Sequence, residues 1–214
     1  MVLRKQHFLN ILYGDFMIRF IIFDLDGVVI DFSWRQYIDY KSKILGVNSE
    51  TFADIFLPLK EQWDLGEITL SELESSLAHK LGVKKKEIGV LNGFKKLGKP
   101  NKDIRKLIFS LSKKYKIGVI TNVGSSRFKI EKRSYINDLP LNGSVASCYL
   151  KVKKPDPRIY MHALRRFRAS PKEVVFIDDT EENVIAARKL GIISIVFNNR
   201  VQLLRDLEKY NIKP

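Results

Sequence analysis

Short apolar segments alternate with amphipathic helical patterns along this chain of 214 residues, and this alternation restricts its fold more than any other feature. The strand-like segments cover residues 18–23, 115–121, 144–149, 174–178 and 192–197. Strands that alternate with helices pair in parallel, because the helix supplies the long crossover that a parallel connection requires. The sequence therefore predicts an α/β fold, a doubly wound parallel sheet of the Rossmann type with helices on both faces.

A long insertion separates the first two predicted strands, since residues 24–114 lie between them. Helical periodicity covers residues 34–45, 51–63 and 71–81 of this interval, and the last pattern opens with a possible capping box of Thr69 or Ser71 with Glu72 or Glu74. We therefore expect a small all-helical cap at residues 34–94, inserted after the first strand. Residues 98–101, Gly-Lys-Pro-Asn, are the expected return linker, and residues 17–33 and 95–214 form the α/β core.

The first sixteen residues have no clear role in this fold. They carry Arg4 and Lys5 before a short apolar patch, but Asn10 interrupts the patch and no cleavage site of small residues follows. This pattern does not predict a signal peptide. We expect residues 1–16 to be an N-terminal extension, and Met17, which leads directly into the first strand, is an alternative start to Met1.

Composition excludes several classes of protein. The single cysteine, Cys148, excludes an internal disulfide and a cysteine-based zinc site, which favours a reducing compartment such as the cytoplasm. Asp24 and Asp26 interrupt the best candidate for a membrane-spanning helix. The net charge of +14 is spread along the chain, so a lysine-rich solvated surface is favoured over a nucleic-acid partner. A positive field would still attract phosphorylated molecules.

Polar side chains cluster at the ends of the predicted strands. They occur as Asp24-Leu25-Asp26-Gly27, Thr121-Asn122, Lys153-Lys154-Pro155 and Asp178-Asp179 with Asn183. Ligands of open α/β sheets bind at the carboxyl ends of the strands, where these residues should meet. Ionised carboxylates are costly to bury unless a cation or a hydrogen-bond network accompanies them. The sequence therefore predicts a site at this edge of the sheet.

Each of these residues also has an ordinary structural interpretation. Thr121 can cap a backbone amide at a strand end, Lys154 can be solvated, and Asp179 can cap the helix that starts near Thr180. Four such coincidences in one order are less probable than a shared site. His7, His79 and His162 have no metal-ligand spacing, and Cys148 is expected to be a small buried residue.

The four motifs, in this order, resemble those of the haloacid dehalogenase-like hydrolase superfamily, and the match extends from residue 17 to about residue 198. The insertion after the first motif is similar to the helical C1 cap of its phosphatase-type members. The resemblance implies that Mg²⁺ is held by Asp24, the Asp26 carbonyl and Asp179, with Asp178 acting through water. It further implies that Thr121, the amides of Asn122 and Val123, and Lys154 hold the phosphoryl oxygens. Asn183 takes the later acidic or amide position.

The same resemblance implies the chemistry. Asp24 would attack phosphorus and form an aspartyl-phosphate, and Asp26 would protonate the leaving alkoxide and then activate water. Dehalogenase-like members lack an acid two residues after the nucleophile, so Asp26 favours phosphate ester hydrolysis. The expected enzyme is a Mg²⁺-dependent phosphatase for small phosphorylated metabolites, of the sugar phosphate or phosphoglycolate class.

Several alternatives stay open at this point. A phosphomutase uses the same aspartyl-phosphate but returns the phosphoryl group to a sugar, and a non-catalytic binding or regulatory module would keep only the fold. Nucleic-acid binding through the basic surface ranks behind both. The substrate is expected to depend on the cap, where the candidates are Trp34, Arg35, Tyr37, Lys41, Lys60 and Trp63, although packing is the favoured role of the aromatic ones. Oligomeric state has no sequence signal.

Overall fold

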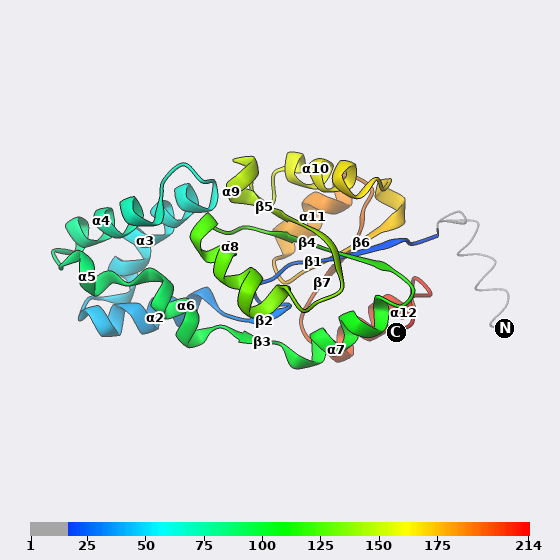
Figure 1. The fold of residues 1–214 in the computed structure, drawn as a ribbon, viewed down its shortest axis with the longest axis horizontal. Coiled ribbons are helices and arrows are strands. Elements are labelled where there is room, and N and C mark those ends of the chain that lie inside the picture. Colours follow the sequence, from blue (N-terminus) through cyan, green and yellow to red (C-terminus); the bar gives the residue numbers. More distant parts are fainter. Residues whose placement is uncertain (1–16) are drawn as a thin grey trace.

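The computed structural model describes residues 17–214, and its centre is a five-stranded parallel sheet (Figure 1). The strand order is β5-β4-β1-β6-β7. The strands are β1 (Phe20–Phe23), β4 (Lys116–Thr121), β5 (Leu141–Ala146), β6 (Val174–Asp178) and β7 (Ile193–Val196). The predicted α/β fold is confirmed. The predictions that concern residues 1–16, namely the N-terminal extension, the start at Met1 and His7, lie outside the described residues.

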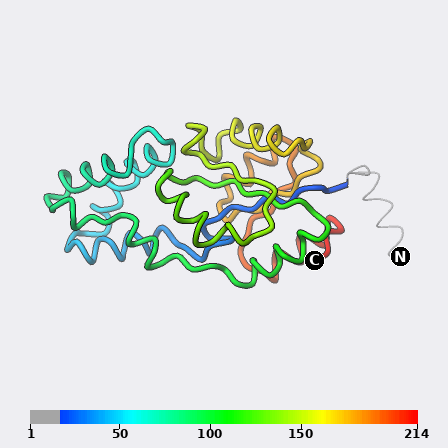
Figure 2. Tube along the Cα trace, in the orientation of Figure 1, coloured from blue at the N-terminus to red at the C-terminus, as the bar shows by residue number. Residues whose placement is uncertain are grey.

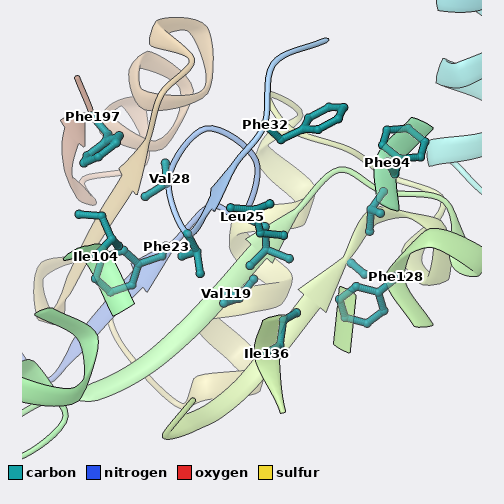
Figure 3. Packing of buried hydrophobic residues seen from close by; sticks show 14 of the residues in the cluster. Phe23, Leu25, Val28, Phe32, Phe94, Ile104, Val119, Phe128, Ile136 and Phe197 are labelled. Atoms are coloured by element: carbon teal, nitrogen blue, oxygen red, sulfur yellow. The ribbon is translucent and has the colours of Figure 1, made fainter. Parts of the chain in front are cut away.

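Alternate residues of β1 face two separate layers of helices. Phe20 and Ile22 pack in a cluster with α10 (Pro157–Phe167) and α11 (Glu181–Lys189). Ile21 and Phe23 pack on the opposite face, where the helices are α7 (Lys102–Leu111), α8 (Ser125–Glu131) and α12 (Arg200–Glu208). Figure 3 shows this second cluster from close by, with Phe23, Val119 and Phe128 among its members. The central strand is therefore buried on both faces, which explains its continuous apolar sequence.

Five helices gather at one end of the molecule, beyond the carboxyl ends of the strands (Figures 1 and 2). They are α2 (Trp34–Leu45), α3 (Ser49–Asp64), α4 (Leu70–Leu81), α5 (Lys85–Ile88) and α6 (Val90–Leu97). Ser33, Asn48 and Thr69 cap the first three through their side chains. Thr69 and Glu72 form the capping box, one of the pairings that the sequence allows. We call residues 34–97 the helical segment.

Two short strands connect the helical segment to the sheet, and the sequence did not predict them. β2 (Ile30–Asp31) pairs antiparallel with β3 (Lys99–Pro100), with Ile30 opposite Pro100 and Asp31 opposite Lys99. The predicted return linker, residues 98–101, therefore contains β3. The chain enters the helical segment through β2 and returns through β3. The two connections to the sheet therefore lie side by side.

The predicted strand at residues 144–149 is wrong in position, because the observed strand is β5 (Leu141–Ala146) and α9 (Ser147–Leu150) follows it. Asn142-Gly143 resembles a turn but lies inside this edge strand, where the register with β4 shifts. The Asn142 side chain accepts a hydrogen bond from the Ile117 amide at 2.8 Å, and a Cβ on Gly143 would lie 2.9 Å from the Phe167 ring. A bulge closed by a side chain is a tertiary feature that local propensity does not report.

Two further short helical turns lie between the elements described above. A π-helical turn, Lys132–Ile136, continues α8, and a 3₁₀ turn, Pro171–Glu173, leads into β6. In the part of the chain that the structure describes, no helix is both long and apolar enough to span a membrane.

Candidate active site

The sheet order brings the predicted site residues to one edge. β4, β1 and β6 are neighbours, and they end at Thr121, Phe23 and Asp178. Asp24 follows β1 directly, and its amide donates to the Ile177 carbonyl of β6 at 2.8 Å. Parallel strands carry their carboxyl ends on the same side, so the ends of three strands converge here.

Lys154 lies at the centre of this edge and is buried, with 2% of its surface exposed. Its Nζ lies 2.7 Å from Asp24 Oδ1 and 2.6 Å from Asp178 Oδ2, and it donates to the Ile120 carbonyl at 3.1 Å. Asn183 Nδ2 donates to both Asp178 oxygens, at 3.0 and 3.1 Å. We call Lys154, Asp24, Asp178 and Asn183 the lysine cluster. The structure thus brings together residues that the sequence placed 130 positions apart, from Asp24 to Lys154.

The charges of the lysine cluster depend on one another. Burial raises the pKa of Asp24 well above its ordinary value, Lys154 opposes this rise, and Asp178 and Asp26 add to it. Burial acts to lower the pKa of Lys154, but its ion pairs with Asp178 and Asp24 raise the pKa overall. The lysine therefore stays charged, and the edge contains more negative groups than it can neutralise.

Asp179 lies beside the turn that carries Asp24 and Asp26. A Cβ on Gly27 would lie 2.0 Å from Asp179 Oδ2, and Gly27 has a φ of +75°, so only glycine fits there. The amides of Val28, Val29 and Ile30 all donate to the Leu25 carbonyl, which closes the turn. The glycine of the Asp-x-Asp-Gly motif therefore makes room for the second acidic pair.

Asp24, Asp178 and Asp179 form the group of side chains that suits a metal ion in the described part of the chain. One carboxylate oxygen from each lies within 4.8 Å of the others. Partial desolvation of its carboxyl group by the surrounding protein and the neighbouring Asp178 raise the pKa of Asp179. Three crowded carboxylates with a single lysine form a hard-oxygen donor set, and the charge of a divalent cation would stabilise their ionised forms.

Asp178 and Asp179 are unequal as ligands. Asp178 is fully buried, and its Oδ1 accepts from the Thr180 amide at 2.9 Å in addition to its contacts with Lys154 and Asn183. Asp179 is exposed and has one hydrogen bond at its Oδ1, from Thr180 Oγ1 at 3.3 Å. Asp179 therefore has more free oxygen positions for a ligand contact than Asp178 has.

The residues that follow β4 match the predicted phosphate-binding contacts only in part. Thr121 is buried at the carboxyl end of β4, as expected. Both ends of the Asn122 side-chain amide are held by the Lys154 backbone, because Nδ2 donates to the Lys154 carbonyl at 2.9 Å and Oδ1 accepts from the Lys154 amide at 2.8 Å. Asn122 would therefore bind phosphate only through its backbone. The Val123 amide, expected to bind a phosphoryl oxygen, donates instead to Ser147 Oγ at 2.9 Å, so that expectation is wrong.

A second buried group of charges, which the sequence analysis missed, adjoins Asp26. Arg127 on α8 is 3% exposed, and its Nη2 lies 2.5 Å from Asp26 Oδ1. Its Nε lies 2.7 Å from Glu131 Oε1, four residues later on the same helix. We call Arg127, Asp26 and Glu131 the arginine cluster. The only local signal was the spacing of Arg127 and Glu131, which is common on solvated helix faces.

The candidate residues of the helical segment mostly have structural roles. Tyr37 and Trp63 are fully buried in the core, so the packing interpretation favoured for these aromatic residues is confirmed. Lys41 is also buried, and its Nζ donates to the Ile88 carbonyl. Trp34 is half-buried, and Lys60 Nζ lies 4.0 Å from the centre of its ring. Arg35 is exposed.

The residues excluded from the site also behave as expected. Cys148 is buried, and burial raises the pKa of its thiol to about 11, so it is not an activated nucleophile. His79 lies on the exposed face of α4, and His162 lies on α10. Neither belongs to the carboxylate group.

A parallel sheet with a carboxylate and lysine cluster at its carboxyl edge, and helices inserted after the first strand, defines a class of phosphoryl-transfer hydrolases. The sequence matches the haloacid dehalogenase-like hydrolase family over residues 18–191. The chain belongs to this family, which confirms the resemblance inferred from the motifs.

Two similar proteins that align with this chain over most of their own length are phosphatases. A sesquiterpene phosphatase of Aspergillus oryzae is 27% identical over 197 residues, which cover 88% of this chain and 94% of that protein. D-ribitol-5-phosphate phosphatase of Bacteroides thetaiotaomicron is 25% identical, with 82% of this chain and 89% of that protein covered. A wild-type family enzyme of the same bacterium, solved with magnesium and inorganic phosphate, has a TM-score of 0.72 at 25% identity, covering 88% and 100% of the two chains.

These findings define the chain at a general level. It is a hydrolase of the phosphatase type within this family, and the family enzyme of similar fold was solved with magnesium. The carboxylate group described above fits that ion.

Proposed function

We propose that this chain is a Mg²⁺-dependent phosphatase that hydrolyses small phosphorylated metabolites through an aspartyl-phosphate on Asp24. The observation that carries the proposal is the lysine cluster, in which Asp24 Oδ1 lies 2.7 Å from Lys154 Nζ at the shared edge of three strands. A carboxylate held there by a buried cation is oriented for attack but is not fully neutralised, since its second oxygen is outside this ion pair.

The metal ion would be held by the carboxylates of Asp24 and Asp179 and by the Asp26 carbonyl, with Asp178 behind them. When bound, Mg²⁺ reduces the repulsion between the phosphate and the carboxylates and stabilises charge on the phosphoryl oxygens. Asp178 contributes by fixing Lys154 and Asn183, with which it forms hydrogen bonds of 2.6 to 3.1 Å.

In the first step, an Asp24 oxygen attacks phosphorus in line and the bond to the leaving oxygen breaks. Lys154 and the Thr121 hydroxyl stabilise the negative charge on the phosphoryl oxygens. Lys154 is well suited to this role because its ammonium stays charged in a buried position.

Asp26 transfers the protons. It donates one to the departing alkoxide, and the resulting carboxylate then removes a proton from the water that attacks the acyl phosphate. Water adds to phosphorus, the phosphorus bond to Asp24 breaks, and inorganic phosphate leaves. Asp26 follows Asp24 by two residues in the closed turn and contributes to the raised pKa of Asp24, which supports a role for both carboxyl groups at one reacting group.

The substrate class we propose is a monophosphate ester of a small molecule, of the sugar phosphate or phosphoglycolate class. Residues 34–94 act as the cap that selects it, and the cytoplasm is its proposed compartment. The positive net charge of +14 supports attraction of such anions. Two relatives act, by name, on a sesquiterpene and on D-ribitol 5-phosphate, so esters of an apolar alcohol and of a sugar alcohol both belong in a substrate screen.

The decisive experiment is the Asp24→Asn variant with p-nitrophenyl phosphate and Mg²⁺. We expect wild-type turnover and a loss of at least about 1,000-fold in the variant, because an amide is a very poor nucleophile. Asp103→Asn, which changes an exposed carboxylate in the first turn of α7, is the matched control and should keep full activity. Undiminished turnover by Asp24→Asn contradicts the mechanism.

Product analysis distinguishes the alternatives. A phosphatase releases one equivalent of inorganic phosphate for each ester cleaved, whereas a phosphomutase isomerises a sugar phosphate with little release. A binding module gives neither product. Removal of Mg²⁺ with a chelator should abolish turnover, and added Mg²⁺ should restore it.

A further inference from the structure

Arg127 is in direct contact with the proposed acid and base of the reaction. The guanidinium donates from Nη2 to Asp26 Oδ1 at 2.5 Å. Asp26 is only half-buried, whereas Arg127 is almost completely enclosed. The hydrogen bond therefore fixes the rotation of a carboxylate that would otherwise reach solvent, and leaves its Oδ2 for the reaction.

The other face of the guanidinium meets the helical segment. The Arg127 Cζ lies 4.0 Å from the centre of the Phe94 ring, 4.7 Å from that of Phe32 and 5.1 Å from that of Trp34. Trp34 opens α2 and Phe94 belongs to α6, so these two rings come from the first and last helices of the helical segment, and Phe32 lies just before it. Arg127 itself belongs to α8, which packs on the sheet. The side chain therefore lies between the sheet-packed helix α8 and the helical segment, and it connects Asp26 to the helical segment.

Stability alone does not account for this arrangement. The buried Arg127 Nη1 and the buried Glu131 Oε2 have no hydrogen-bond partner among the described residues. Buried ion groups with incomplete hydrogen bonding often stabilise a fold no better than apolar residues of the same volume. The crevice beside them, about 20 Å³ and lined by Phe32, Phe94 and Tyr135, has room for roughly one water molecule.

We propose that Arg127 is a positioning residue for proton transfer. It holds the Asp26 carboxyl group, with Oδ1 accepting from the guanidinium and the transferable proton on Oδ2, toward the leaving-group oxygen when the aromatic rings of the helical segment are packed on the guanidinium. Closure of the helical segment and orientation of the acid are then one event. This inference rests on the proposed function, since it assigns a role within that reaction.

The test compares two leaving groups. p-Nitrophenolate leaves without a proton, whereas the alkoxide of glycerol 2-phosphate requires one. kcat/KM reports the steps up to the first irreversible one, so for both esters it contains cleavage of the leaving-group bond and excludes later hydrolysis of the aspartyl-phosphate. The ratio of the two kcat/KM values therefore isolates proton donation.

We expect Arg127→Met to lower kcat/KM for glycerol 2-phosphate by about 100-fold and for p-nitrophenyl phosphate by less than about 5-fold, because misplacement of an acid affects only the ester that needs it. Asp26→Asn is the reference variant. It should also lower kcat/KM more for glycerol 2-phosphate than for p-nitrophenyl phosphate, and by a larger factor than Arg127→Met does. Arg133→Met, an exposed arginine in the adjacent turn, is the matched control and should leave both values unchanged.

Equal losses for both esters, or no loss, would overturn the role of Arg127. Should Arg127→Met fail to fold by circular dichroism, Arg127→Lys decides, since a lysine keeps the charge but lacks the planar fork; an unchanged ratio in that variant overturns the proposal. Trp34→Leu, which removes one of the three rings, should shift the ratio in the same direction by a smaller factor. A wild type that cleaves neither ester refutes the proposed function itself.

Discussion

The lysine cluster and the arginine cluster both bury a cation between two carboxylates, yet they are built differently. Lys154 joins Asp24 and Asp178, both of which follow or end strands of one rigid sheet. Arg127 joins Asp26 and Glu131 from a helix and lies against aromatic rings of the helical segment. The sheet places the two acids of the first cluster, and Lys154 reaches them from the loop before α10, whereas the second cluster depends on how α8 and the helical segment pack together.

Hydrogen bonding separates them further. Asp178 accepts from Lys154, Asn183 and the Thr180 amide, so a full network surrounds it. Glu131 is as deeply buried but has only its ion pair with Arg127. A satisfied network fixes one geometry, whereas a partly satisfied one is more easily rearranged. The comparison suggests a rigid centre for bond formation beside a more adjustable centre for proton transfer.

The largest effect is expected when the cation of the lysine cluster is removed. Lys154→Met leaves Asp24 and Asp178 buried without their shared partner, which should lower the free energy of unfolding by about 3–5 kcal/mol and abolish turnover. Urea unfolding and phosphate release measure the two effects. Lys153→Met is the matched control, because the Lys153 ion pair with Glu61 is largely exposed and should contribute less than about 1 kcal/mol. Equal losses in the two variants would contradict the structural distinction.

An intermediate effect is expected from the pH dependence of the arginine cluster. Burial raises the pKa of Glu131 to about 8 from its ordinary 4.5, although Arg127 opposes the rise. The folded state then binds more protons than the unfolded state between these values, so the stability that this group contributes is present at low pH and is lost as the pH rises toward 8. The slope approaches about 1.4 kcal/mol per pH unit in that interval.

Glu131→Gln tests this expectation, because glutamine keeps the shape and does not titrate. Urea unfolding between pH 5 and about 8 should show a shallower decline of stability in the variant than in the wild type. Glu67→Gln, at an exposed glutamate of the helical segment, should leave the wild-type profile unchanged. Identical slopes for wild type and Glu131→Gln would show that Glu131 is ionised throughout this range.

The lysine cluster could be predicted from the sequence and the arginine cluster could not, for a physical reason. Asp24, Thr121 and Asp178 end apolar strands, and parallel pairing brings such ends together regardless of how other parts pack. Arg127 contacts Asp26 in this orientation only because the guanidinium on α8 also packs against the rings of Phe32 and Phe94. That contact depends on tertiary packing, which neither periodicity nor residue type specifies.

The same distinction explains the errors in the fold. The bounds of α2 were predicted correctly, because local caps define them: Ser33 at its start and Gly46 at its end. β5 was misplaced because Asn142 closes a bulge with its side chain, a contact made across to β4. The pair of β2 and β3 was missed because two-residue strands have no periodicity to detect.

The smallest expected effect on stability comes from removing one tyrosine hydroxyl beside each cluster. Tyr160 donates to the Asn183 carbonyl at 2.9 Å in a fully buried position, and Tyr135 donates to the Gly98 carbonyl at the same distance where the ring is partly exposed. Tyr160→Phe should lower the free energy of unfolding by about 1.5 kcal/mol and Tyr135→Phe by about 0.5 kcal/mol, because water replaces a lost partner only where it has access. Urea unfolding of the two variants gives the difference directly, since both changes remove one oxygen and keep the ring. If Tyr135→Phe lowers the free energy of unfolding more than Tyr160→Phe does, the packing around the arginine cluster is as closed and ordered as the sheet edge. The proposed contrast between a rigid and an adjustable centre then fails.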